Sequence, residues 1–166
     1  MTAPDLVAPV VGFRRWRVVG DHLCSPYTPV PWRTRTITAR CYPVYASVWV
    51  TGRWVDGTHE SPHPDCQCGV YATYTPPAPD AQSAWLVDGI VGLWGRIEAH
   101  GDGMRAQHAR LEALGLPAGW PAPRRAAVAA IAGRLGVPLL ETAALTAVAA
   151  DFGDPLPRHL RGPRAA

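Results

Sequence analysis

A chain of 166 residues, 48% of them hydrophobic and 17% charged, fits a single domain that buries its own core, with a short tail. Its formal net charge of +3 comes from 16 arginines, with no lysine, against 13 acidic residues, a smaller excess than a protein that neutralises many phosphates usually carries. No apolar run reaches about 18 residues and the start carries no secretion signal, so we expect a cytoplasmic protein with no membrane span and with reduced cysteines.

The first predicted element is a β-hairpin near the start of the chain. We expect residues 1–9 to be a flexible N-terminus and a single β-rich domain to cover 10–153. Apolar and arginine residues alternate over 11–19, and Gly20 and Asp21 then turn the chain back. Further strands are predicted over 35–41, 44–50 and 69–75, with a polar, proline-containing loop over 56–64.

A second hairpin is predicted in the middle of the chain. Residues 89–99 alternate in polarity, and the turn Gly101-Asp102-Gly103 leads into a strand over 104–111. A three-residue loop would place Glu98 opposite Ala106, Arg96 opposite His108 and Trp94 opposite Arg110.

The composition becomes rich in alanine after residue 123, which indicates helices. Apolar residues recur at helical spacing over about 124–135 and again over about 142–152. Residues 154–166 are expected to be a disordered basic tail with Arg158, Arg161 and Arg164. The predicted fold class is therefore α+β, a small antiparallel β-barrel or curved sheet with two C-terminal helices.

The strongest chemical signal is a group of soft metal ligands. Cys66 and Cys68 lie in one turn next to Gly69, and Cys41 ends an earlier strand. A tight turn that supplies two thiolates is how structural zinc sites limit the entropy lost on closing the chain. We therefore predict a structural zinc site formed by Cys41, His63, Cys66 and Cys68.

The fourth ligand is the least constrained member of that set. His63 is preferred because it lies three residues before Cys66, while His59 and Cys24 remain open alternatives. Cys-x-Cys is a weaker zinc signal than paired Cys-x2-Cys turns, and free cysteines are often simply buried small residues. A cytidine deaminase is excluded, since that family needs Pro-Cys-x-x-Cys well downstream of its His-x-Glu motif.

Three stretches carry a resemblance to a group of proteins. They are residues 39–41, 59–72 (HESPHPDCQCGVYA) and 89–109 (GIVGLWGRIEAHGDGMRAQHA), with Gly136-Val137-Pro138 after a helix. The pattern resembles a group of uncharacterised small proteins from actinobacteria and their mobile elements, over about residues 10–140. The resemblance implies a shared fold and a shared cysteine-rich turn, and it brings no activity with it.

Two further sets of side chains are weighed against ordinary structural roles. Arg96, Glu98 and His108 are candidates for acid/base catalysis if they share a cleft, although such a group more often lines a solvated sheet face. Tryptophans near arginines could stack on nucleic-acid bases, although about two of Trp16, Trp32, Trp54 and Trp94 should fill the core instead. The candidate nucleic-acid contacts are Arg14, Arg15, Trp16 and Arg17.

Together these patterns favour a binding module over an enzyme. The sequence contains no nucleophile motif and no glycine-rich phosphate loop, so no organic cofactor is expected. The prediction is a zinc-stabilised binding or accessory protein whose first partner to test is nucleic acid. The alternatives are a protein–protein interaction module and an enzyme that uses the metal or the Glu98 and His108 face.

Overall fold

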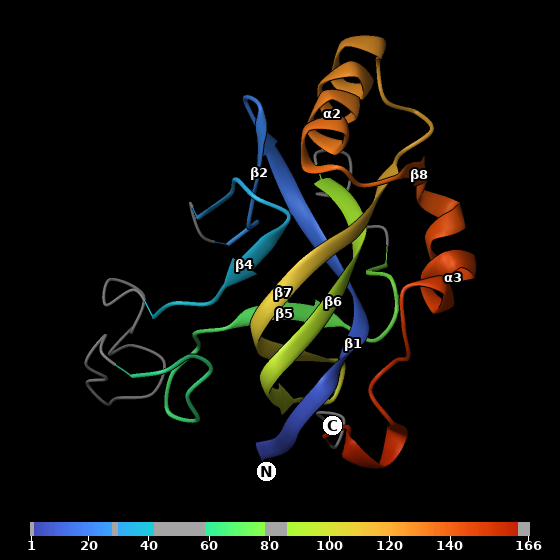
Figure 1. The fold of residues 1–166 in the computed structure, drawn as a ribbon. Coiled ribbons are helices and arrows are strands. Elements are labelled where there is room, and N and C mark those ends of the chain that lie inside the picture. Colours follow the sequence, from blue (N-terminus) through green and yellow to red (C-terminus); the bar gives the residue numbers. More distant parts are fainter. Residues whose placement is uncertain (1, 28–29, 42–58, 79–85, 163–166) are drawn as a thin grey trace.

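The computed structural model describes residues 2–27, 30–41, 59–78 and 86–162 (Figure 1). The chain is an α+β protein, mostly sheet, with two helical segments near its C-terminus. No helix among these residues is both long and apolar enough to cross a membrane. The strand predicted over 44–50 and Trp54 lie outside the described residues.

Three long antiparallel strands form the centre of the sheet. They are β1 (Thr2–Val19), β6 (Leu86–Ala99) and β7 (Gly103–Leu116). Strand β6 lies between the other two, with Phe13 of β1 opposite Ile90 and Ile97 opposite Ala106 of β7. The inward residues of β6 and β7 are aliphatic and almost fully buried, which explains why both segments are extended.

Short strands extend this centre on both sides. Strand β2 (His22–Cys24) pairs with β1 and with β3 (Pro31–Trp32), while β4 (Thr36–Thr38) and β5 (Val70–Thr73) both pair with β7. Because β5 also contacts β1 through Phe13 and Thr73, the pairings β1–β6–β7–β5–β1 form a closed circuit. The sheet therefore curves around its own apolar face.

The core fills this curve with aromatic and aliphatic side chains. Trp16 and Trp32 are buried and meet edge to face, with ring centroids 5.3 Å apart. Trp94 is half-buried. The prediction that about two of the four tryptophans fill the core is confirmed for the described residues.

The helices cover one end of the sheet. Helix α2 (Ala122–Leu135) buries Val128, Ile131, Ala132 and Leu135, and ends at Gly136 with a left-handed φ of 65°. After β8 (Leu139–Glu141), which runs parallel to β7, come the short turns η3 (Thr142–Ala144), α3 (Leu145–Val148) and η4 (Ala149–Asp151). The first predicted helix is confirmed, and the second is a run of three short helical turns.

Both chain ends contain described residues that pair with the sheet or pack against it. The expected flexible segment begins strand β1, where Thr2 pairs with Glu98 of β6. In the expected tail, Val11 N donates to Asp154 O, Leu156 is fully buried, and η5 (Arg158–Leu160) follows. Thr2 and Gly162 both lie at the end of β6, because Thr2 pairs with Glu98 and Gly162 lies beside Ala99 and His100. Tertiary pairing therefore places these segments where local sequence gives no signal.

The predicted register of the central hairpin is wrong. Glu98 faces Arg105 instead of Ala106, and Trp94 faces His108 instead of Arg110. The turn leaves Ala99 opposite Met104, and the pairing shifts again at Gly95, whose φ is 76°. This bulge needs the left-handed backbone that glycine adopts without strain, and alternation alone does not place it.

Candidate metal centre

Strand β7 holds together two segments that are far apart in the sequence. Cys41 follows β4, whose residue Thr38 pairs with His108, and Ala39 N donates to Gln107 O at 2.7 Å. The turn that carries Cys66 and Cys68 leads directly into β5, which pairs with the same strand β7. The sheet therefore brings the thiols of both segments to one place.

Four donor atoms meet at this place. The sulfurs of Cys41, Cys66 and Cys68 and a ring nitrogen of His59 all lie within 4.8 Å of one another. The Sγ atoms of Cys41 and Cys66 are 3.7 Å apart, and His59 Nε2 is 3.3 Å from Cys68 Sγ. All four cysteines of the chain are free thiols. The cluster can hold a metal ion that accepts both sulfur and nitrogen ligands.

The histidine in this group is His59 and not the preferred His63. His63 lies beside it, with ring centroids 4.6 Å apart, but its Nδ1 accepts a hydrogen bond from Asp65 N at 3.2 Å. Cys24, the other alternative, is buried in β2 among core residues. Spacing along the chain favours His63, which is closer in sequence to Cys66. The fold of the turn instead brings His59 to the sulfurs.

Arg105 holds the turn that carries Cys66 and Cys68. This residue was not among the candidates predicted from the sequence. This buried side chain on β7 donates to the backbone carbonyls of Cys66, Cys68 and His63, the last two at 3.3 and 3.0 Å. Glu98 on β6 holds the guanidinium, with Oε2 accepting from Nη2 at 2.6 Å and from Nε at 3.0 Å. The sequence signal for this role was that Arg105 lies among apolar residues. Arg105 is identified as the partner of Glu98 only when the strand register is known.

Gly69 lets the backbone of the turn approach Arg105. Its φ is 135°, a conformation that side-chain-bearing residues rarely adopt, and a Cβ there would lie 3.0 Å from Arg105 Cβ. The glycine after Cys68 therefore shapes the turn as its sequence position indicates.

The environment of the thiols favours their protonated form when no metal is present. Burial, together with the neighbouring thiols of Cys66 and Cys68, raises the pKa of Cys41 to about 12. Burial also raises the pKa of Cys68 above its ordinary value. Both thiols therefore keep their protons at neutral pH until a cation displaces them.

Metal binding is expected to release at least about two protons at pH 7.5, from the thiols of Cys41 and Cys68, whose pKa values are raised. Since a raised thiol pKa leaves the proton in place below that pKa, these two thiols alone should lower the apparent affinity about a hundredfold for each pH unit of acidification. Titration calorimetry with zinc in buffers of different ionisation enthalpy counts the protons. Release of fewer than about one proton would contradict thiolate coordination.

The catalytic candidates do not come together. Arg96 pairs with Glu60 at 3.0 Å, and Glu98 is engaged by Arg105. His108 Nδ1 lies 3.0 Å from Thr38 Oγ1, and its ring stacks on Trp94 with centroids 5.5 Å apart. Each of the three candidates has a structural partner of its own.

The candidate nucleic-acid contacts are largely used inside the fold. Trp16 is fully buried, and Arg15 Nε donates to Asp88 at 2.7 Å. Arg14 packs toward the rings of Trp16 and Trp32, at 5.8 and 5.6 Å from their centroids. Of the four predicted contacts, only Arg17 is exposed.

Comparisons of the chain with protein-family models, with curated proteins and with solved structures found no match. The geometry of the chain itself, chiefly the three thiols and one imidazole of this cluster, therefore carries the functional inference.

Proposed function

We propose that this protein is a zinc-stabilised binding or accessory module in which Cys41, His59, Cys66 and Cys68 hold the ion. The observation that supports the proposal is the convergence of four donor atoms within 4.8 Å from two segments that are well separated in the sequence. Neutral imidazole and thiolates are the ligands that zinc prefers in structural sites.

The distances agree with a tetrahedral zinc site. Zn–S bonds of about 2.3 Å at tetrahedral angles place two sulfurs about 3.8 Å apart, and a sulfur and an imidazole nitrogen about 3.5 Å apart. The separations in the structure are 3.7 Å between Cys41 and Cys66 and 3.3 Å between His59 and Cys68. Only small side-chain shifts are needed to centre an ion among these atoms.

The donor count favours a structural role over a catalytic one. Four protein ligands fill a tetrahedral ion, whereas catalytic zinc keeps one position for water or substrate. The ion would tie the turn before β5 to the chain after β4, and so would close a loop of the sheet. This supports a module that binds a partner rather than an enzyme.

Protein and nucleic acid remain the two classes of macromolecular partner. Exposed arginines at positions 17, 33, 40 and 158 offer phosphate contacts. Exposed Tyr27 and Tyr71 are large apolar groups of the kind used at protein interfaces. Phosphate contacts weaken steeply with added salt and an apolar interface does not, so salt dependence of binding separates the two classes.

The ligand assignment is tested with a matched pair of histidine variants. We expect His59→Ala to weaken zinc binding at least about 100-fold, because it removes one of four ligands, whereas His63→Ala should change the affinity less than about fivefold. Competition with a chromophoric chelator measures both affinities. Equal losses in the two variants, or a larger loss in His63→Ala, would remove His59 from the site.

A further inference from the structure

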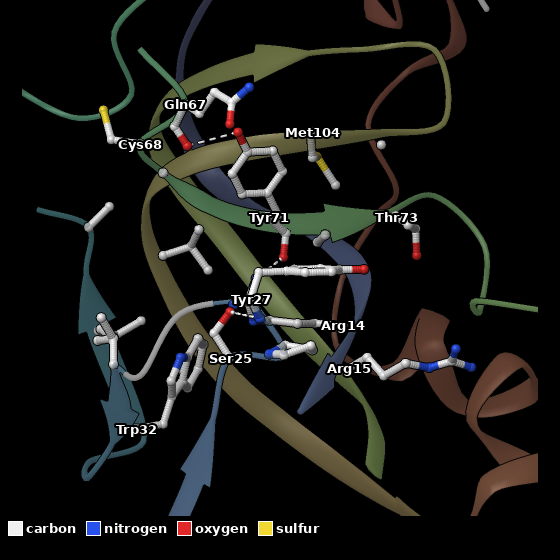
Figure 2. Close-up of a pocket in the computed structure, with 18 of the residues that line it drawn as sticks. Arg14, Arg15, Ser25, Tyr27, Trp32, Gln67, Cys68, Tyr71, Thr73 and Met104 are labelled. Atoms are coloured by element: carbon white, nitrogen blue, oxygen red, sulfur yellow. Dashed lines mark hydrogen bonds between the residues drawn. The ribbon is translucent and has the colours of Figure 1, made fainter. Parts of the chain in front are cut away.

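A cavity of about 1640 Å³ lies beside the metal centre. Its walls come from β1, β3, β4, β5 and the turn that carries Cys66 and Cys68 (Figure 2). Three of the candidate zinc ligands, Cys41, Cys66 and Cys68, line one side of the cavity. A different group of side chains, centred on Arg14, lines the rest, so the cavity offers a site beyond the proposed zinc centre.

The charged residues that line the cavity are mostly of one sign. Among the described residues that line it, the arginines are at positions 14, 15, 33 and 40 and the acidic residue is Asp102. Asp88 neutralises Arg15, whose Nε lies 2.7 Å from Oδ1. The described residues of the lining therefore keep a net positive charge. A concave surface with one sign of charge concentrates ligands of the opposite sign.

Arg14 is the most informative of these arginines. Its Nη1 donates to Tyr71 O, its Nε is buried with no hydrogen-bond partner, and no carboxylate of the described residues pairs with it. Its guanidinium carbon lies 5.6 Å from the Trp32 ring centroid. Burial lowers the pKa of Arg14 to about 10, which shows how poorly the surroundings compensate its charge.

The aromatic side chain of Tyr27 lines the same cavity and interacts electrostatically with Arg14. Figure 2 shows the Tyr27 ring extended over Arg14, between Ser25 and Tyr71. Tyr27 is 88% exposed, although it is a large ring that usually gains by burial. A flat apolar group that enters above Arg14 would cover this ring.

We propose that the cavity binds a small organic anion, whose carboxylate or phosphate group pairs with Arg14 and whose flat apolar body packs against Tyr27. Arginine recognises both anions through two parallel N–H groups. A free inorganic ion would fill little of a cavity of about 1640 Å³, so the ligand needs an organic body.

The test uses the zinc-containing protein and three naphthalene probes of one shape. The probes are 1-naphthoate, 1-naphthyl phosphate and the neutral 1-naphthamide, and the shifts of the Trp16 and Trp32 indole N–H signals report binding. We expect at least one anion to bind about tenfold or more tightly than the amide. Comparing the affinities of 1-naphthoate and 1-naphthyl phosphate shows which anionic group the cavity prefers.

Variants locate the site. Arg14→Met keeps an unbranched side chain against the tryptophans and should abolish the preference for the anion, whereas Arg17→Met removes an exposed arginine of the same strand and should keep it. Tyr27→Ala, at an exposed position, should weaken both anions about fivefold without affecting folding. Zinc content measured for each variant separates loss of this site from failure of the metal centre.

The proposal is overturned if the amide binds as tightly as both anions, or if no probe shifts the indole signals at millimolar concentration. It is also overturned if Arg17→Met lowers anion affinity as much as Arg14→Met. If Arg14→Met does not fold, the Tyr27→Ala result decides, because unchanged affinity there would place the probes elsewhere.

Discussion

Replacing Cys66 by alanine is expected to lower the free energy of unfolding by at least about 3 kcal/mol, because the affinity for a structural zinc ion is part of the folding free energy. Cys66 is the buried thiol of the cluster, 3.7 Å from Cys41 Sγ. Its loss leaves three donors and frees the turn that leads into β5. Urea unfolding at pH 7.5, with and without a zinc chelator, measures the change.

Cys24→Ala is the matched control for this substitution. Cys24 is equally a buried free thiol, but it lies in β2 and outside the cluster. Removing it should cost about 1 kcal/mol from lost packing, and the variant should still be destabilised by chelator. The Cys66 variant should be insensitive to chelator. Equal costs in both variants, with no effect of chelator on the parent protein, would show that the cluster holds no stabilising metal.

Replacing Arg105 by methionine is expected to cost about 3–5 kcal/mol, because it leaves a mostly buried carboxylate without its partner. Arg105 is 4% exposed and Glu98 18% exposed at their side chains, and the same guanidinium satisfies three carbonyls of the metal turn. The midpoint of urea unfolding reports the loss.

Arg96→Met provides the comparison on the neighbouring strand. Its ion pair with Glu60 is exposed, with side-chain exposures of 37% and 70%, so its removal should cost less than about 1 kcal/mol. Adding Glu98→Gln to Arg105→Met should recover part of the stability, since it removes the unpaired charge. If Arg105→Met and Arg96→Met cost the same, Arg105 does not support the turn.

Most of the metal cluster could be predicted from the sequence, because its members are chemically distinctive and most of them lie close together along the chain. Cys66 and Cys68 share one turn, and Cys41 was predicted at the end of a strand and lies just after β4, so thiol chemistry and strand polarity indicated three of the four donors. The choice between His59 and His63 depends on the path of a turn with several prolines, and spacing does not determine that path. The prediction of α2 succeeded because Val128, Ile131, Ala132 and Leu135 recur at helical spacing.

The support of the cluster was not predictable, since it depends on register. Arg105 meets Glu98 only because the turn leaves Ala99 opposite Met104, one residue away from the pairing that a three-residue loop gives. The pairing of the first residues with β6 was missed for a related reason. Residues before Pro9 show no strand pattern, and pairing with β6, far along the chain, makes them a strand. The cavity likewise collects described residues that lie far apart in the sequence, from Phe13 to Met104.

The metal content of the purified protein tests the account most directly. Elemental analysis after expression with zinc present should find about one zinc per chain, and three thiols should resist a thiol reagent until the metal is removed. Less than about half an equivalent of zinc, with the thiols of Cys41, Cys66 and Cys68 free to react, would contradict the zinc site.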